Sequence, residues 1–234
     1  MKLQYGNHLE RVYERLRDSI VAGDLPPGTR LIEAELVEQL ELSRTPIRSA
    51  LQRLRQDGFV VSNGTGKKSK LTVAPLTRAD ADELFMLVGS VEGLGGQLAA
   101  SLDAADRRSL ARELKWINKE LADVAASNGA SKNRIFQLDE RFHEAYVRAA
   151  AGPRLLAWHE SIKPQAERYI RIYIEALVGD IGKSVDEHAT TIAAIERGDA
   201  SGARRAIERN WSNAAERLAA VIDEVGERGG WIRR

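Results

Sequence analysis

The chain contains no cysteine among its 234 residues, so disulfide bonds play no part in its stability. This composition fits a reducing compartment, and we expect a cytoplasmic protein. We find neither a signal peptide nor an apolar run long enough to cross a bilayer, so we expect no membrane partner. Net charge is also lacking, because 35 basic and 34 acidic side chains leave only +1. Any recognition of a polyanion must therefore depend on local charge.

Length and pattern indicate two domains. Residues 1–76 contain short amphipathic segments and a hairpin signal, whereas residues 77–234 are helical almost throughout. We expect a small domain at 1–76 and a larger helical domain at 77–234. The segment 73–77 is the only link that we expect between them, and its proline limits flexibility.

Segment 40–61 carries the signals of one short helix. Ser43 is a favourable N-cap, and Pro46 falls in the first turn, where its missing N–H costs nothing. Gly58 is typical of the residue that ends a helix. Apolar residues recur at helical spacing in between and predict a buried stripe, namely Ile47, Ala50, Leu51 and Leu54.

Arg44 and Arg48 lie one turn apart at the start of this helix and off its apolar stripe. A helix N-terminus that carries guanidinium groups fits a DNA major groove, where arginine pairs with guanine or binds phosphate. Residues 44–70 hold four arginines and three lysines against one aspartate, a net charge of +6, whereas residues 77–234 carry −2. The local concentration of charge favours a DNA-binding surface over the alternative, a solvated helix face.

The flanking segments complete a winged helix-turn-helix. Residues 8–22 predict an amphipathic helix, and residues 31–40 hold another helix about three residues before the arginine-bearing one. Strands are predicted at 59–61 and 71–73, around Asn63-Gly64, which is a strong hairpin signal. Lys67 and Lys68 follow this turn, so we expect a basic wing that contacts phosphate.

The pattern S-R-T-P-I-R-x-A-L-x-x-L-x-x-x-G at residues 43–58 resembles the signature of the GntR family of bacterial transcription regulators. This resemblance implies that Arg44, Thr45 and Arg48 contact DNA. It also implies that Gly64, at the tip of the wing, approaches the minor groove.

The C-terminal region is predicted to be an α-helical bundle of six or seven helices. Glycine, proline and short polar breaks separate its periodic segments. Pro164 is expected to kink or split the fourth of these helices. The predicted helices span residues 77–100, 102–126, 132–150, 154–177, 181–197 and 200–225.

One group of side chains in this region suggests a metal site. Asp139 and His143 are four residues apart, so they project from the same face of one helix. His188 lies on a later predicted helix. One carboxylate and two imidazoles suit a divalent metal such as zinc. By spacing alone, the commoner arrangement is a solvent-facing Asp–His pair with an unrelated His188.

The motif D-x-x-F-H-x-A at 139–145 and the pattern E-H-x-x-I-x-x-A-I-x-x-G-D-A at 187–200 resemble the FCD ligand-sensing domain of one GntR subgroup. The resemblance implies a metal, held by an aspartate and three histidines, that contacts an organic-acid effector. Asp139, His143 and His188 match three of these ligands.

Two positions depart from the FCD pattern. Asn210 stands where the third histidine is expected, and an amide oxygen is a weaker ligand for zinc than imidazole. We therefore expect weakened binding of a divalent ion, which could be zinc, nickel or manganese. Val88 stands where the family usually has an arginine, so a group that holds the effector carboxylate is missing. The sequence offers Arg134, Arg168 and Arg171 as other cations without singling one out.

These observations predict a mainly α protein with an N-terminal winged helix-turn-helix, a small β-hairpin wing and an all-α, FCD-like bundle. We expect a nucleoid-associated, ligand-responsive regulator, a repressor on family grounds, that binds a palindromic operator as a homodimer. One alternative is a metal-dependent hydrolase or lyase that uses Asp139, His143 and His188 as ligands and Glu140 or Glu144 as base. Another is an architectural DNA binder without an effector.

Overall fold

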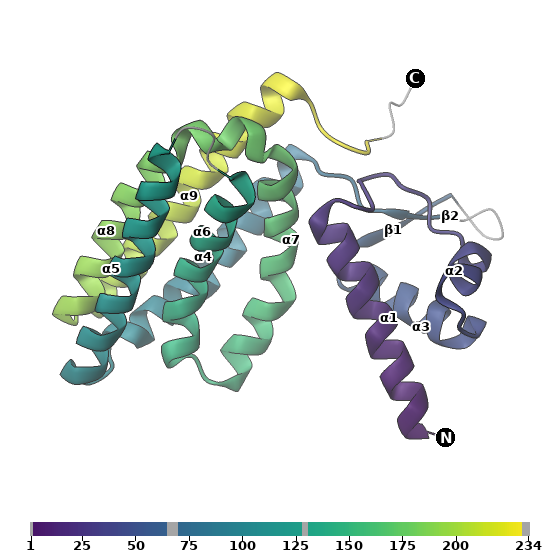
Figure 1. Ribbon diagram of the computed structural model, residues 1–234, viewed down its shortest axis with the longest axis horizontal. Coiled ribbons are helices and arrows are strands. Elements are labelled where there is room, and N and C mark those ends of the chain that lie inside the picture. Colours follow the sequence, from purple (N-terminus) through teal and green to yellow (C-terminus); the bar gives the residue numbers. More distant parts are fainter. Residues whose placement is uncertain (1, 65–69, 128–130, 231–234) are drawn as a thin grey trace. The chain divides into compact units, whose positions relative to one another are not determined.

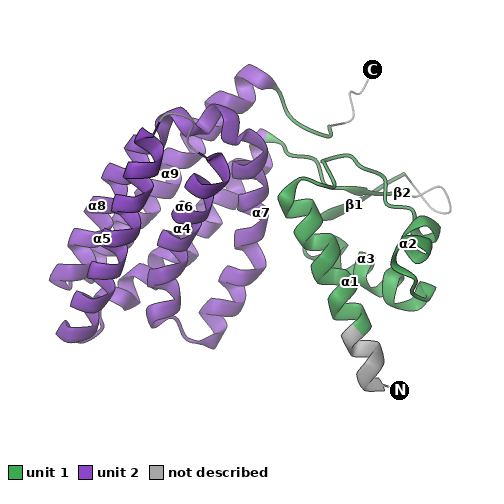
Figure 2. Cartoon of the chain, viewed as in Figure 1, with its two compact units in different colours: residues 1–77, 226–234 green, residues 78–225 purple. Residues whose placement is uncertain are grey.

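A computed structural model describes residues 2–64, 70–127 and 131–230, with the backbone alone for residues 2–7. The chain divides into two compact units (Figure 2). Unit 1 consists of Met1–Thr77 together with Gly226–Arg234, and unit 2 is Arg78–Val225. The first boundary lies one residue from the expected one. The C-terminal segment differs from our expectation, because it belongs to unit 1 and not to the bundle.

Unit 1 has the element order of a winged helix-turn-helix (Figure 1). The first helix begins at Lys2, earlier than the predicted residue 8, and its end is as predicted. Ser43 occupies the N-cap of α3, but its side chain makes no capping hydrogen bond. Both strands reach one or two residues further toward the hairpin tip than predicted. The elements are α1 (Lys2–Ala22), α2 (Glu33–Leu40), α3 (Arg44–Gln56), β1 (Val60–Asn63) and β2 (Lys70–Val73).

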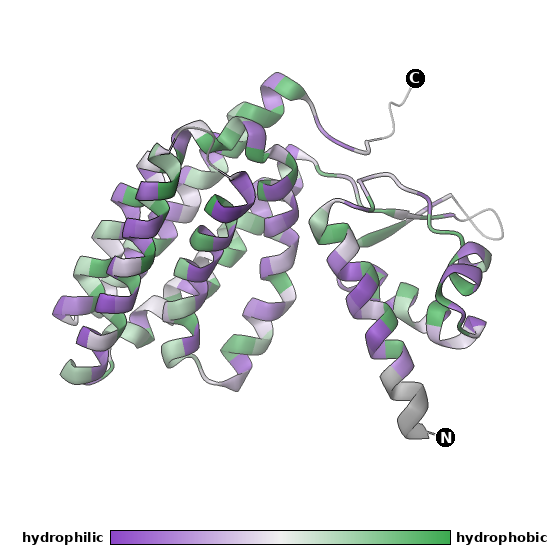
Figure 3. Cartoon of the chain, viewed as in Figure 1, coloured by the Kyte–Doolittle hydropathy of each residue, from purple (hydrophilic) through white to green (hydrophobic). Residues whose placement is uncertain are grey.

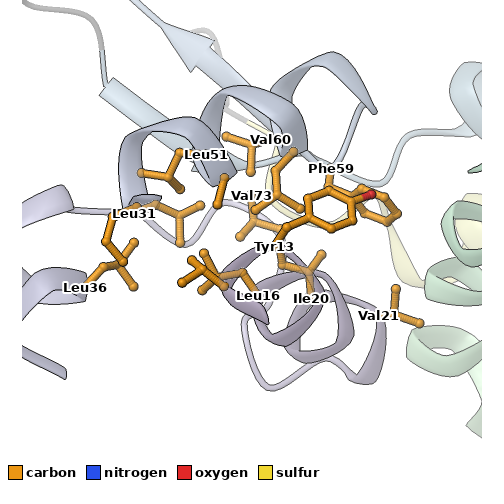
Figure 4. Close-up of a cluster of buried hydrophobic side chains, with 14 residues drawn as sticks. Tyr13, Leu16, Ile20, Val21, Leu31, Leu36, Leu51, Phe59, Val60 and Val73 are labelled. Atoms are coloured by element: carbon orange, nitrogen blue, oxygen red, sulfur yellow. The ribbon is translucent and has the colours of Figure 1, made fainter. Parts of the chain in front are cut away.

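A single apolar core holds these elements together. Figure 4 shows side chains of α1, α3 and both strands pointing toward one another. The predicted stripe of α3 is buried here, with Ile47 and Leu54 fully enclosed. Burial of this stripe fixes which face of α3 is left for solvent, so the core determines which arginines are presented.

The two strands pair antiparallel, with Val60 opposite Val73 and Asn63 opposite Lys70. Gly64 follows with φ of 98°, a conformation that glycine adopts without strain. Residues 65–69 lie outside the described part of the chain, and the expectations for Lys67 and Lys68 fall there.

Unit 2 is an antiparallel helical bundle, and its six α-helices and one short 3-10 helix agree with the predicted number for the described residues (Figure 1). Most helices display hydrophobic and hydrophilic residues on different faces (Figure 3). We expected Pro164 to kink or split its helix; the split is wrong, because α7 continues through this residue as one helix, and the kink stays a prediction. The elements are α4 (Arg78–Ala100), α5 (Ala104–Ala126), α6 (Lys132–Ala150), α7 (Pro153–Leu177), η2 (Val178–Asp180), α8 (Ile181–Arg197) and α9 (Ala200–Val225).

Glycines let α4 and α9 approach closely. A Cβ atom on Gly89 would lie 2.8 Å from Cβ of Trp211, and one on Gly93 would lie 3.1 Å from Cγ of Glu208. Real side chains do not tolerate the first of these contacts. Small residues on α4 therefore seat Trp211 against the helix, and this places its indole beside the centre of the bundle.

The segment after α9 packs within unit 1. Leu76 and Arg228 exchange two backbone hydrogen bonds, with N···O distances of 2.8 and 3.1 Å. Gly229, at φ of 70°, lies against the Pro27-Gly28 turn. The expectation that segment 73–77 is the only connection between the units is therefore wrong, since the chain passes between them a second time at Val225–Gly226.

Candidate DNA-binding surface and metal centre

The start of α3 presents the predicted DNA-contacting residues to solvent. Arg44, Thr45 and Arg48 are exposed, whereas Pro46 and Ile47 between them are buried. The helix is thus anchored through one face and free on the other. Gly64 is exposed at the described edge of the hairpin.

The arginines of α3 have different roles. Arg48 makes a bidentate pair with Glu33 of α2, with Nε–Oε2 and Nη2–Oε1 distances of 3.2 and 2.9 Å. Arg53 stacks on the Tyr13 ring at 3.8 Å and pairs with Glu10 at 2.6 Å, so it ties α3 to α1. Charge counting along the sequence could not separate the stabilising Arg53 from the presented Arg48.

The predicted metal ligands meet in unit 2. Asp139 and His143 on α6 and His188 on α8 each offer one ligand atom, and these atoms lie within 4.8 Å of one another. His143 and His188 are almost fully buried, while Asp139 is partly exposed. The alternative of a solvent-facing Asp–His pair with an unrelated His188 is therefore wrong.

The orientation of His188 is set by Asn118 on α5. Asn118 donates its Nδ2–H to the carbonyl of Val185 at 3.0 Å, so its Oδ1 is the atom that faces His188 Nδ1 at 3.1 Å. Nε2 of His188 lies 3.7 Å from Asp139 Oδ1, and it is buried without a hydrogen-bond partner in the described structure. Burial, followed by the neighbouring His143, holds the pKa of His188 well below its usual value, which keeps the ring neutral. A buried lone pair that faces a carboxylate suits a cation between them.

The other histidine is held by a buried carboxylate on α4. His143 Nδ1 lies 2.7 Å from Oε2 of Glu92, which is completely buried. Phe142 stacks on the His188 ring with centroids 3.8 Å apart, and this contact fixes the spacing between α6 and α8. Both imidazoles therefore keep one nitrogen for a protein partner and one for the cluster.

Five donors converge on the Glu92 carboxylate. Its Oε1 accepts from His159 Nε2 at 3.0 Å and Lys163 Nζ at 2.9 Å. Its Oε2 accepts from Tyr146 Oη and Trp211 Nε1, both at 2.7 Å, in addition to His143. A buried charge is tolerable only with partners of this quality.

Neighbouring charges keep Glu92 and Lys163 ionised. Burial alone would raise the pKa of Glu92, but Lys163 and His143 outweigh it and hold that pKa well below the usual range. Burial opposes the charge on Lys163, yet Glu92 and Glu167 raise its pKa above the usual value. Glu92 and Lys163 therefore form a buried ion pair beside the candidate metal ligands.

Asn210 is buried on α9, where its side chain contacts Glu187 on α8. Its Nδ2 lies 2.6 Å from Glu187 Oε2, and Glu187 also accepts from Asn213 and Arg217. These donors hold the pKa of Glu187 below its usual value against the effect of burial. Since Asn210 donates its amide N–H to Glu187, its oxygen is the atom left for a metal, and that role stays a prediction.

A cavity of about 70 Å³ adjoins Asp139. Its wall is mostly apolar and includes Arg217, which pairs with Glu187 at 2.9 Å. Arg134, Arg168 and Arg171 do not line it. The lining residues are Phe85, Ile135, Phe136, Asp139, Ile170, Ile174, Leu177, Val178, Asp180, Ile181, Ser184, Ala214 and Arg217.

Sequence reasoning missed Glu92 and the residues around it. One signal was present, because Glu92 is the only charged residue between Glu83 and the end of α4. A lone carboxylate in an otherwise apolar helix is usually buried with a partner. His159 on α7 is one of those partners.

Comparison with known families explains the two units. Residues 9–66 match the model for bacterial regulatory proteins of the gntR family, and residues 83–213 match the FCD domain. The chain belongs to the GntR family. This GntR protein is therefore a DNA-binding transcription regulator with an FCD domain, and both resemblances seen in the sequence are confirmed. Family members of this kind are regulators and not enzymes, so the hydrolase or lyase alternative has no support.

Curated relatives agree over most of the length of this GntR regulator. It is 25% identical to an uncharacterized HTH-type transcriptional regulator, YdhC, of Bacillus subtilis, over 92% of each chain. It is 26% identical to the gluconate operon transcriptional repressor of Bacillus licheniformis, over 87% of this chain and 82% of the relative.

Solved structures share the fold. McbR/YncC of E. coli has 21% identity and a TM-score of 0.68, covering 93% of this chain and 98% of that one. A putative GntR regulator of Rhodococcus sp. RHA1 has 22% identity and a TM-score of 0.69, covering 92% and 98%. None of the helices in the described ranges is both long and apolar enough to span a membrane.

Proposed function

We propose that this GntR protein is a ligand-responsive repressor that binds a palindromic operator as a homodimer. We further propose that its bundle binds a divalent metal and a small organic acid. The observation that carries the proposal is the exposed group Arg44, Thr45 and Arg48 at the start of α3, on a helix whose opposite face is buried.

Recognition of DNA follows from this presentation. The N-terminus of α3 enters the major groove, where Arg44 and Arg48 reach base edges or phosphates. We propose that Gly64, at the described edge of the hairpin, and Lys67 and Lys68, which follow it in the sequence, contact the flanking backbone and minor groove. One short helix reads too few base pairs for useful specificity, so two copies on paired half-sites are required.

The experiment uses operator fragments selected from genomic DNA by the full-length protein. Arg48→Ala is expected to weaken binding to the selected site on the order of tenfold or more, since one bidentate base contact is lost. Arg55→Ala is the control, because Arg55 is exposed at the far end of the same helix and has the same charge. Equal losses in both variants would indicate a general charge effect and would contradict the assigned reading surface.

Homodimerisation is supported by α4. Its middle section is apolar on the face that packs in the bundle and also on the face that is exposed. On the outer face Met86 is 63%, Leu87 45%, Leu94 40% and Leu98 43% exposed. A helix that is hydrophobic on all sides is normally covered on all sides, and a second copy of this chain is the occupant that a palindromic site requires.

Sedimentation of the free protein tests this surface. Leu94→Glu is expected to shift the protein toward monomer and to abolish high-affinity binding to the palindromic site, while binding to a half-site remains weak. Trp158→Glu is the control, because Trp158 is 70% exposed on α7 and does not belong to the α4 face. A dimer that survives Leu94→Glu unchanged would assign the interface elsewhere.

The metal proposal rests on Asp139, His143 and His188. Their donor set fits zinc, nickel or manganese, and the unpartnered Nε2 of His188 facing Asp139 is the observation that supports occupancy by a cation. When bound, the ion would supply positive charge beside the cavity that Asp139 lines. The apolar wall and Arg217 suit a small organic acid with a hydrophobic body.

Metal content and thermal shifts test the sensor. Protein purified without chelator is expected to contain near-stoichiometric metal by elemental analysis, and His188→Gln is expected to lose it. A carboxylic acid at 100 times its Kd adds about 2.7 kcal/mol of stability, which a thermal shift detects readily. An effector-free architectural binder would show DNA binding, no shift with any acid and no change of operator affinity.

Repression and coupling complete the proposal. Relatives named as operon repressors favour repression over activation. An effector acts only by favouring one conformation, so changes near Asp139 and His188 must reach the DNA-binding unit. We place that transmission at segment 73–77. Release of operator DNA by metal plus acid, measured by gel shift, is the expected result.

A further inference from the structure

Two side chains outside the candidate ligand set control the proton positions of both histidines. Nδ1 of His143 lies 2.7 Å from Glu92, and Nδ1 of His188 lies 3.1 Å from Asn118. A neutral imidazole carries one proton, and the partner of one nitrogen decides which nitrogen has it. The contacts at Nδ1 therefore bear on the availability of Nε2.

For His188 the proton position follows from a backbone carbonyl. The carbonyl of Val185 accepts from Asn118 Nδ2, which leaves Oδ1 of Asn118 as an obligatory acceptor. His188 Nδ1 must then donate, and Nε2 keeps its lone pair. This lone pair is on the nitrogen that lies 3.7 Å from Oδ1 of Asp139.

For His143 the proton on Nδ1 follows from the anion on α4. The ionised carboxylate of Glu92 can only accept, and Tyr146 spends its single proton on the same oxygen at 2.7 Å. His143 Nδ1 must therefore carry a proton. Lys163 and His159 hold the other oxygen of Glu92, so the carboxylate cannot rotate away from this arrangement.

We propose that Glu92 and Asn118 are positioning residues of the metal site: each binds the Nδ1–H of one histidine and leaves Nε2 of His143 and His188 as a ligand beside Asp139. The proposal rests on the metal-binding part of the proposed function. Outer partners of this kind orient a ligating imidazole and raise its basicity, and their loss typically lowers metal affinity about 10- to 100-fold.

The first test needs no metal. The chain has four histidines, so 15N spectra of histidine-labelled, chelator-stripped full-length protein are simple to assign with His8→Gln and His159→Gln. We expect a protonated Nδ1 in both His143 and His188, a bare Nε2 in His188, and a protonated Nε2 in His159, which donates through that atom. A proton on Nε2 of His188, or an Nδ1 of His143 that carries no proton, overturns the proposal.

The second test measures zinc and nickel affinity by competition with a chromophoric chelator. Asn118→Ala is expected to weaken binding about 10- to 100-fold. Asn118→Asp keeps the acceptor for His188, so its metal affinity is expected to stay within about threefold of wild type. Its second oxygen faces the carbonyl of Val185, so a lower melting temperature of this variant does not count against the proposal. Asn213→Ala is the matched control, since Asn213 donates to Glu187 and not to a histidine.

The outcomes separate cleanly. Equal metal affinity in Asn118→Ala and wild type, or equal losses in Asn118→Ala and Asn118→Asp, overturns the positioning role. Glu92→Gln is the parallel variant for His143, and if it fails to fold, the spectra and the Asn118 pair still decide. Wild-type protein that binds no metal refutes the metal proposal, whereas the proton positions in the stripped protein are measured independently.

Discussion

Arg48 donates hydrogen bonds from Nε and Nη2 to the two carboxylate oxygens of Glu33, on the solvent side of the helix-turn-helix. The Arg48 side chain remains 70% exposed, so solvent screens the pair and its effect on folding is small. The pair instead orients Arg48, because it holds this long flexible side chain in one geometry before the protein binds DNA. Preorganisation of this kind lowers the entropy that binding must offset.

Replacing Glu33 is therefore expected to affect specific and non-specific binding in opposite directions. Glu33→Gln removes a negative charge near phosphate, which strengthens binding to random DNA. It also frees Arg48, which lowers the preference for the operator by about tenfold at most. Competition titrations with operator and random duplexes measure both, and Glu38→Gln, exposed on the same helix, is the control. An unchanged ratio of the two affinities would contradict this role.

Glu167 is expected to make the bundle less stable as pH rises. Burial, with help from Glu140 and against Lys163, raises the pKa of Glu167 from 4.5 to about 7. The folded state then binds more protons than the unfolded chain between these values, so stability falls from about pH 4.5 to 7 and levels off above. The loss is on the order of 3 kcal/mol at most.

Denaturant unfolding at several pH values checks this dependence. Glu167→Gln mimics the protonated side chain, so the loss of stability in that pH window should be smaller than in wild type. Glu160→Gln on the same helix changes a side chain that is 57% exposed and should leave the window unaltered. A Glu167→Gln profile that parallels the wild type would refute the assignment.

Gly89 is expected to resist enlargement. An alanine Cβ there would approach Trp211 Cβ to 2.8 Å, a contact with the root of the side chain that cannot move aside easily. We expect a net loss of about 1–3 kcal/mol from overpacking. Gly182→Ala in α8 is the control, because nothing lies within 4 Å of that position and helix propensity favours alanine by about 1 kcal/mol. Thermal melts should move in opposite directions.

Gly229 is expected to matter for the DNA-binding unit although it is remote in sequence. Its φ of 70° disfavours other residues, and a Cβ would lie 2.5 Å from the carbonyl carbon of Pro27. Gly229→Ala should lower the melting temperature of unit 1 and weaken operator binding in proportion. Gly230→Ala, with nothing within 4 Å, should do neither. Equal behaviour of the two variants would mean that this packing is dispensable.

The helices were predictable because local chemistry marks their ends. Gly152-Pro153 and Gly198 interrupt the periodicity of the bundle, and the observed ends fall at or next to these breaks. At Pro164 only the predicted split is wrong, and a kink there stays a prediction. Buried side chains on both sides of it, Lys163 and Ala166, hold α7 together.

The candidate metal centre was only partly predictable. Asp139 and His143 are one helical turn apart, so their proximity is a local property of the sequence. Glu92 meets His143 and Trp211 across 51 and 119 residues, and no spacing rule connects positions that far apart. The packing of α4 against α6 and α9 brings them together, and that packing depends on glycines whose partners the sequence does not reveal.

The return of residues 226–230 to unit 1 changes how this regulator can be dissected or rebuilt. A fragment that stops at Thr77 would lack the strand-like neighbour of Leu76 and the cover over the Pro27-Gly28 turn. Exchange of sensory modules between relatives would need two matched junctions, one on each side of the bundle.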